Sequence, residues 1–234
     1  MSLSYQSIIS TALRALSIRA DELDEEQSVR GIDALNELQI HALLEDAFIE
    51  DGFGVVRESH YPSDGDAYTT SSRRQRCDLV LMSDPKRSLI DPTYELKQLA
   101  MAQDTLFAES QSLHPDPTTT CPPEDAWWIE IKSCAQFAYR DGVPTPNPGY
   151  AHELVSGLQT DVCKLSADPH IWHAASLITL FCEDETIARH DLNQAASMCM
   201  DQDLPIQSPL IETHSITDRG GNGCVSIGLF PLSI

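Results

Sequence analysis

An acidic and a basic side chain lie two residues apart within one apolar run of the sequence, Ala126-Trp127-Trp128-Ile129-Glu130-Ile131-Lys132. Because side chains alternate between the two faces of a β-strand, this run predicts that Glu130 and Lys132 share a face with Trp128. A charged group on a packed face is costly unless it is paired with an opposite charge or holds a metal ion. The pattern therefore predicts either a buried ion pair or a catalytic site.

Two further acids lie in segments that should be partly buried. Asp78 belongs to the short apolar run 76–82, which predicts a second strand. Glu37 lies in segment 28–51, which has helical spacing, and it continues the apolar stripe that includes Ile40 and Leu44. An acid on that stripe either coordinates a metal ion or lies at the end of the helix and reaches solvent.

Along the chain these elements follow in the order of a helix with an acid, a strand at 55–58, a strand with Asp78 and a strand with Glu130 and Lys132. This order resembles that of the PD-(D/E)xK nuclease superfamily. In that superfamily the Asp and Glu bind a divalent metal, the Lys assists the attacking water or the transition state, and an acid on the first helix often completes the site. The resemblance covers about residues 30–182. It departs from the motif at Cys77, which stands where the proline would be.

The resemblance implies catalytic roles for Asp78, Glu130 and Lys132. Asp78 and Glu130 would bind Mg²⁺ or Mn²⁺, which prefer hard oxygen ligands. The carbonyl of Ile131 would be a third ligand, and Glu37 would lie in the outer shell of the metal. Lys132 would orient or deprotonate the water, or offset negative charge as it develops on the phosphate.

The resemblance also implies a restriction-endonuclease-like α/β fold with three layers, in which a mixed central sheet is flanked by helices. The length of 234 residues predicts one domain, residues 1–234. Its core is expected at about 30–182, with a helical and loop insertion at about 84–125 before the Glu130 strand. In that insertion, 93–110 has helical spacing and 113–123 is rich in proline. A C-terminal helix and strand are expected within 183–234.

The same spacing rules predict the remaining elements. Helices are expected at 4–20, 150–167 and 184–201, strands at 176–182 and 225–230, a turn at 59–72 and a Pro- and Gly-rich segment at 140–150. The helix at 150–167 carries Gln159 and Lys164. By resemblance these two side chains reach the phosphate of the substrate, and the alternative is that they lie on a solvent-facing helix surface.

The formal charge of −21 is unusual for a protein that binds nucleic acid, because phosphate neutralisation by basic side chains supplies much of the affinity. The basic residues are nevertheless concentrated near Asp78. Six of the fifteen lie between positions 57 and 87, and they are Arg57, Arg73, Arg74, Arg76, Lys86 and Arg87. They form either a basic rim beside the site, with Arg76 as a substrate-binding residue, or a set of solvated loop charges.

Seven cysteines without a Cys-x-x-Cys pair predict buried free thiols in a reducing compartment. No apolar run reaches the roughly 20 residues of a membrane span, and the first residues lack the pattern of a secretory signal. The sequence therefore predicts a cytoplasmic protein that has no membrane partner.

Together these observations predict a metal-dependent nuclease, with DNA favoured over RNA as the substrate. One alternative is a catalytically weak or inactive member of the same fold that binds or assembles with a basic protein, which the acidic surface would suit. Another is a plain α/β domain in which Glu130 and Lys132 form a structural ion pair. A homodimer is compatible with each of these hypotheses.

Overall fold

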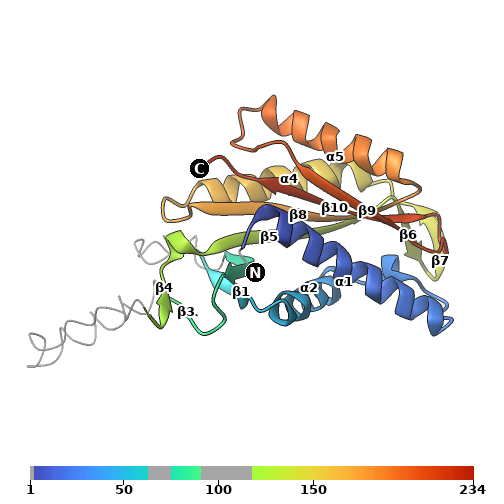
Figure 1. Cartoon of the computed structure of the whole chain (residues 1–234). Coiled ribbons are helices and arrows are strands. Elements are labelled where there is room, and N and C mark those ends of the chain that lie inside the picture. Colours follow the sequence, from blue (N-terminus) through green and yellow to red (C-terminus); the bar gives the residue numbers. More distant parts are fainter. Residues whose placement is uncertain (1–2, 63–74, 91–117) are drawn as a thin grey trace, which may run out of the picture.

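A six-stranded sheet forms the centre of the computed structural model, which describes residues 3–62, 75–90 and 118–234 (Figure 1). In spatial order its strands are β1 (Gly54–His60), β2 (Arg76–Met82), β5 (Trp127–Ala135), β8 (His173–Cys182), β10 (Cys224–Pro231) and β9 (Leu210–Ser215). Neighbouring strands are antiparallel except β5 and β8, which are parallel. A parallel pair needs a crossover connection, and helix α4 (Tyr150–Ser166) lies in that connection.

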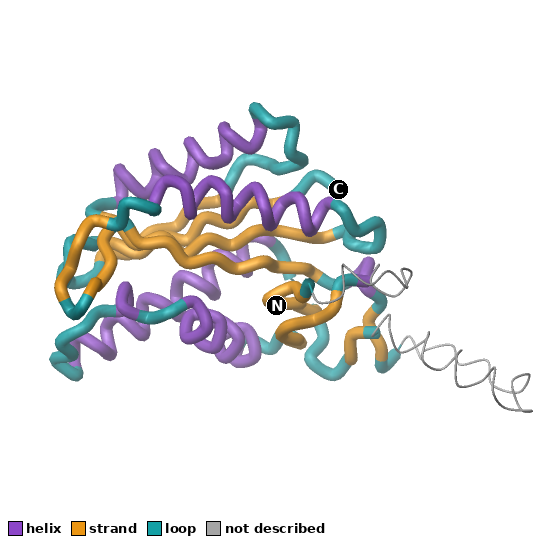
Figure 2. The backbone as a smooth tube through the Cα atoms, turned by 180° about the vertical axis from the view of Figure 1, so that it is seen from behind, coloured by secondary structure: helices purple, strands orange, loops and turns teal. Residues whose placement is uncertain are grey.

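Helices cover both faces of the sheet (Figure 2). Helices α1 (Tyr5–Glu25) and α2 (Glu37–Glu50) pack on one face, and α4 and α5 (Glu185–Met200) pack on the other. The sheet therefore separates two hydrophobic clusters of buried side chains. The predicted α/β architecture, a mixed sheet between layers of helices, is confirmed.

Strand β5 shows the predicted alternation of faces. Trp128 is fully buried in the cluster under α4 and α5, whereas Ile129 and Ile131 are fully buried in the cluster under α1 and α2. Glu130 is consequently directed toward the α4 side of the sheet, where it is only 1% exposed. The apolar pattern alone was sufficient for this result, because the two-residue period of a strand fixes which side chains share a face.

The predicted helix at 28–51 is wrong in its first third. Residues 32–34 form a single 3₁₀ turn, and α2 begins at Glu37. Asn36 caps the N-terminus of this helix. Its side chain accepts a hydrogen bond from the backbone N–H of Gln39, and the Gln39 side chain accepts one from the Asn36 N–H. Glu37 is therefore the first residue of α2 and 42% exposed, as the end-of-helix alternative predicts.

Most of the other predicted elements are confirmed within one to three residues, although α1 ends at Glu25, five residues after its predicted end. A hairpin and an edge strand of the sheet were not predicted. Segment 140–150 contains the whole second strand of a hairpin formed by β6 (Phe137–Arg140) and β7 (Val143–Pro146). Its turn residues Asp141 and Gly142 have positive φ values of 52° and 81°, as tight hairpin turns require. Strand β9 was also missed, because only its first two residues are apolar and the other four are polar.

The ends of the predicted insertion lie beside the sheet. Short strands β3 (Ser88–Leu89) and β4 (Thr120–Cys121) pair in parallel, and a 3₁₀ turn at Pro123–Asp125 leads into β5. The predicted helix at 93–110 and residues 113–117 of the proline-rich segment lie outside the described residues. The same holds for most of the predicted turn at 59–72.

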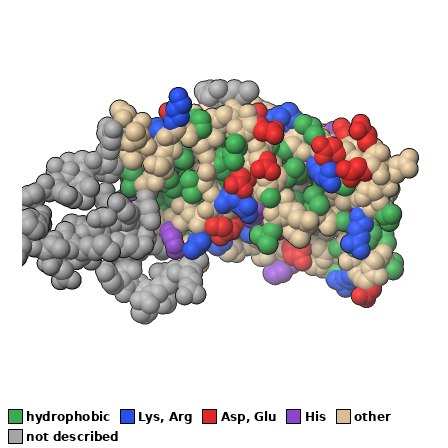
Figure 3. Space-filling model, turned by 90° about the horizontal axis from the view of Figure 1, so that it is seen from below, with side chains coloured by type: hydrophobic (Ala, Val, Ile, Leu, Met, Phe, Trp, Pro, Cys, Tyr) green, Lys and Arg blue, Asp and Glu red, His purple; other side chains and the backbone are tan. Residues whose placement is uncertain are grey.

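All seven cysteines are free thiols, and six of them are buried, as predicted; Cys163 is exposed on α4. Every described helix is too short or too polar to cross a lipid bilayer. On the face formed by α1 and α2, acidic and basic side chains are interspersed (Figure 3).

Candidate functional site

The candidate site lies where strands β2 and β5 separate. The two strands pair only from Leu81 and Trp127 to Leu79 and Ile129. Beyond that point, carboxylates replace the missing strand as hydrogen-bond acceptors for the backbone of β5. Asp78 Oδ2 accepts a hydrogen bond from the Ile131 N–H at 2.7 Å.

Glu37 performs the same role two residues further along β5. Its Oε2 accepts a hydrogen bond from the Ser133 N–H at 3.4 Å. Because α2 begins at Glu37, the side chain extends from the end of the helix toward this open edge of the strand. Two carboxylates are therefore fixed beside β5 by the need to satisfy backbone N–H groups.

Glu130 is the most buried of the charged residues predicted for the site. Its Oε1 accepts a hydrogen bond from the Tyr61 hydroxyl, and its Oε2 lies 3.6 Å from the Nζ of Lys164 on α4. Tyr61 stacks on Trp128 with ring centroids 6.1 Å apart, which holds the hydroxyl in place. Burial, together with the neighbouring Asp78 and Asp161 carboxylates, raises the pKa of Glu130 to about 8.

Asp161 on α4 completes this part of the cluster and was not predicted. It is fully buried; its Oδ1 lies 3.4 Å from Lys164 Nζ, and its Oδ2 has no hydrogen-bond partner among the described residues. Burial raises the pKa of Asp161 to about 6, although the ammonium groups of Lys132 and Lys164 act in the opposite direction. A sequence signal exists, because Asp161 interrupts the apolar stripe of α4 formed by Leu154, Leu158 and Leu165.

Lys132 extends between the sheet and α4. Its Nζ lies 3.8 Å from Glu37 Oε1 and donates a hydrogen bond to the Ile131 carbonyl at 3.3 Å. Its stem passes over Gly157, where an added Cβ would be 3.8 Å from the lysine Cγ and Cδ. Burial by itself would lower the pKa of Lys132, but four surrounding carboxylates outweigh it and raise the pKa: Asp161, Glu37, Asp78 and Glu130. The ammonium is therefore charged at neutral pH.

The structure brings together five of the residues predicted to have a role through their side chains: Glu37, Asp78, Glu130, Lys132 and Lys164. Ile131 contributes through its backbone. Gln159 lies half-buried on α4, and none of its described hydrogen bonds connects it to this cluster. The solvent-facing alternative for Lys164 is wrong, because this side chain is 24% exposed and its ammonium lies between two carboxylates.

Among the described contacts, Glu130 and Lys132 do not form an ion pair with each other, so this alternative is also wrong. Each side chain has a different partner, since Glu130 faces Lys164 and Lys132 faces Glu37. Two residues on the same face of one strand are about 7 Å apart along it, so helices above the sheet can reach each of them separately.

The predicted basic rim is only partly a free surface. Arg57 Nη1 lies 3.1 Å from Glu45 Oε2, and Arg87 Nε donates a hydrogen bond to the Thr120 carbonyl at 2.8 Å. Arg76 and Lys86 are exposed, whereas Arg73 and Arg74 lie outside the described residues.

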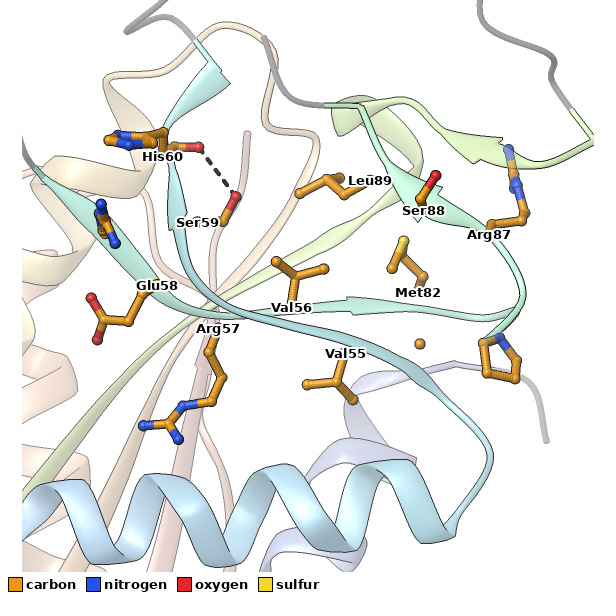
Figure 4. Close-up of a pocket in the computed structure, with 13 residues that line it drawn as sticks. Val55, Val56, Arg57, Glu58, Ser59, His60, Met82, Arg87, Ser88 and Leu89 are labelled. Carbon is orange, nitrogen blue, oxygen red and sulfur yellow. Dashed lines mark hydrogen bonds between the residues drawn. The ribbon is translucent and has the colours of Figure 1, made fainter. Parts of the chain in front are cut away.

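A hollow of about 400 Å³ follows strand β1 and is also lined by residues of β2 and of the segment 85–89 (Figure 4). Its charged lining consists of Arg57, Arg76, Arg87 and Glu58. Figure 4 shows Arg57 directed toward α2 and Arg87 directed away from Val56 and Leu89 in the middle of the hollow. The lining therefore has an excess of basic charge in a strongly acidic protein.

The donor chemistry of the cluster fits a hard divalent cation. Within the described residues, no three His, Cys, Asp or Glu side chains lie close enough together to enclose a metal ion. Mg²⁺, however, usually keeps several waters and is held by one or two carboxylates together with substrate phosphates. Asp78 and Glu130 supply two carboxylates at the separation of β2 and β5, and Asp161 Oδ2 is a buried oxygen without a partner.

The cluster has more acidic than basic groups. With every group in its ordinary charged form, the four carboxylates of Glu37, Asp78, Glu130 and Asp161 exceed the two ammonium groups by two negative charges. Such an excess in a partly desolvated site favours either proton uptake or a cation. Comparison with models of known protein families, with curated proteins and with solved structures found no match for this chain.

Proposed function

We propose that this chain is a metal-dependent nuclease with a restriction-endonuclease-like fold of the PD-(D/E)xK type. The observation that carries the proposal is the position of Asp78 next to Glu130 at the separation of β2 and β5, with Lys132 two residues further along the same strand. The chain order α2, β1, β2, β5, α4, β8 also supports it, because a helix and three strands in this order precede the crossover helix.

In this proposal Asp78 and Glu130 hold Mg²⁺ or Mn²⁺ through their carboxylate oxygens. Such an ion activates a water molecule and neutralises charge on a phosphodiester. Lys132 keeps its proton at neutral pH, so it offsets negative charge on the phosphate and does not deprotonate the water. Glu37 positions Lys132 through their 3.8 Å ion pair and holds the Ser133 N–H.

The test is cleavage of single- and double-stranded DNA and RNA with Mg²⁺ or Mn²⁺, repeated with chelator. We expect cleavage that stops when the metal is removed. Mn²⁺ should also raise the melting temperature by mass action, by the equivalent of about 2.7 kcal/mol at a concentration of roughly 100 times the Kd. In Asp78→Asn, which keeps a carbonyl oxygen for the Ile131 N–H, this rise should be much smaller. Failure to cut any of the four substrates, despite a normal Mn²⁺ response, would contradict the proposal.

A catalytically inactive member of the same fold is the second candidate. The observation that favours it is that both Glu130 oxygens already have partners, Tyr61 and Lys164. The formal charge of −21 would then serve to bind a basic protein. This candidate predicts no rise in melting temperature with Mn²⁺, so the same titration distinguishes it from the nuclease.

The hollow beside β1 leads to a prediction about substrate binding. Arg76 is exposed in its lining and lies two residues before Asp78 on β2. If a nucleic-acid strand lies here, Arg76→Ala should weaken binding of a fluorescent oligonucleotide several-fold in chelator and lower the salt dependence of affinity by about one unit of slope. Arg189→Ala is the matched control, because Arg189 is exposed on α5 and pairs with Glu185. Equal losses in the two variants would show a general charge effect instead.

A further inference from the structure

We propose that Lys164 is an internal cation that competes with the divalent metal for the carboxylates of Glu130 and Asp161. This inference rests on the metal site of the proposed function and adds a means of regulating its occupancy. It starts from the position of the Lys164 ammonium, which lies 3.6 Å from Glu130 Oε2 and 3.4 Å from Asp161 Oδ1. One ammonium thus neutralises two carboxylates that come from different layers of the fold.

In their ionised forms the two carboxylates need a positive charge, because neither has access to water. Glu130 is 1% exposed and Asp161 is fully buried. Ionised carboxyl groups in such positions are costly unless a cation or several hydrogen bonds compensate them. Tyr61 supplies one hydrogen bond to Glu130, so Lys164 is the partner that Glu130 and Asp161 have in common.

Lys164 satisfies this pair incompletely. Asp161 Oδ2 is buried and has no hydrogen-bond partner among the described residues, although the neighbouring Oδ1 faces the ammonium. A small cation with two charges would use this oxygen better than a singly charged ammonium does. The unpaired oxygen is therefore the feature that points to a second occupant of the cluster.

Lys164 also has a route out of the cluster. It lies in the last turn of α4, and its side chain is 24% exposed. The flexible four-carbon stem allows the ammonium to turn into water, where it regains hydration. A displaced Lys164 is then free to contact a substrate phosphate. Lys132 has a different ion-pair partner, Glu37, which is not part of the buried pair of Glu130 and Asp161.

The experiment compares Mn²⁺ binding by calorimetry in wild type, Lys164→Met and Lys164→Arg at one neutral pH. Loss of the competing charge should make Lys164→Met bind Mn²⁺ about tenfold more tightly. Lys164→Arg keeps the charge and should bind at the wild-type level or more weakly. Arg189→Met removes a positive charge from the exposed surface of α5 and should leave the affinity unchanged. If Lys164→Met does not fold, Lys164→Gln provides the same comparison with a neutral donor.

Melting temperatures give a second measurement, which distinguishes competition with the metal from a purely packing role for Lys164. In chelator, Lys164→Met should melt below wild type, because Glu130 and Asp161 then lack their shared cation. Saturating Mn²⁺ should close that gap, since the metal replaces the missing charge. A gap of the same size with and without Mn²⁺ would overturn the proposal.

Other outcomes are equally decisive. Equal or weaker Mn²⁺ binding in Lys164→Met, or no binding in any of the proteins, would also overturn the competition. Cleavage assays on the same samples separate this inference from the proposed function. Tighter Mn²⁺ binding in Lys164→Met without cleavage of any nucleic acid by wild type would support the competition and contradict the nuclease.

Discussion

Replacing Lys132 by methionine should reduce nuclease activity by two to three orders of magnitude and should not weaken the binding of Mn²⁺. The carboxylates that surround Lys132 raise its pKa, so the wild-type ammonium is charged throughout the neutral range. It acts on the phosphate as a fixed positive charge in a partly desolvated position, where such a charge is worth most. Methionine retains the stem that packs over Gly157 and removes only the charge.

The measurement is single-turnover cleavage at saturating Mn²⁺, with Mn²⁺ binding followed separately. Lys132→Ala, which also removes the stem, should lose at least as much activity and some stability in addition. Lys132→Arg is the control that keeps the charge, and it should retain more activity than either neutral variant. Wild-type rates in Lys132→Met would remove this residue from the mechanism.

Replacing Glu130 by glutamine should make the metal-free protein more stable at pH 8 and above, and this gain should disappear below about pH 4.5. The pKa of Glu130 is raised from 4.5 to about 8 in the folded protein. Between these values the folded carboxyl holds a proton that the unfolded chain has released. Wild-type stability therefore falls as the pH rises from about 4.5 to about 8, and the penalty is complete above that range.

The size of this effect is on the order of 3 to 5 kcal/mol, because each unit of pKa shift corresponds to about 1.4 kcal/mol. Asp161 gives both proteins a further pH dependence of the same sign, since its pKa is raised from 3.8 to about 6. Glutamine has nearly the same shape as glutamate and keeps an oxygen that accepts the Tyr61 hydrogen bond. The substitution therefore removes the buried charge with little change in packing.

Urea unfolding in chelator, at a series of pH values from about 4 to 9, gives the free energy of unfolding of both proteins. Glu185→Gln is the control, because Glu185 is an exposed glutamate on α5 and its loss should change stability little at any pH. Adding Mn²⁺ at pH 8 should stabilise wild type more than Glu130→Gln and narrow the difference between them, since only wild type keeps both carboxylates. Lower stability of Glu130→Gln at every pH would contradict this prediction, because it would show that the ionised Glu130 carboxylate stabilises the metal-free fold.

The sequence by itself was sufficient for features that depend on local periodicity. The alternation along β5 put Glu130 and Lys132 on one face, and the apolar run 76–82 identified the strand that carries Asp78. Helix α4 and strand β10 were also predicted, because their apolar residues repeat with the period of the element. These properties depend on neighbours within a few residues, which a sequence shows directly.

Capping was visible in the sequence and was nevertheless misjudged. Asn36 and Gln39 form a capping box that starts α2, yet the apolar spacing suggested a helix from position 28. The error moved Glu37 from the start of the helix to its middle. The local cap determines the true boundary, because it satisfies backbone N–H groups that a longer helix would have to satisfy elsewhere.

Only the tertiary structure decided which charged groups meet. Asp161 belongs to the cluster because the parallel pairing of β5 and β8 requires a crossover, and α4 in that crossover lies over Glu130 and Lys132. The assignment of Lys164 to Glu130 and of Lys132 to Glu37 likewise depends on three elements from different layers. Ion-pair partners and pKa values follow from distances and burial across those layers, and residue spacing along the chain contains neither.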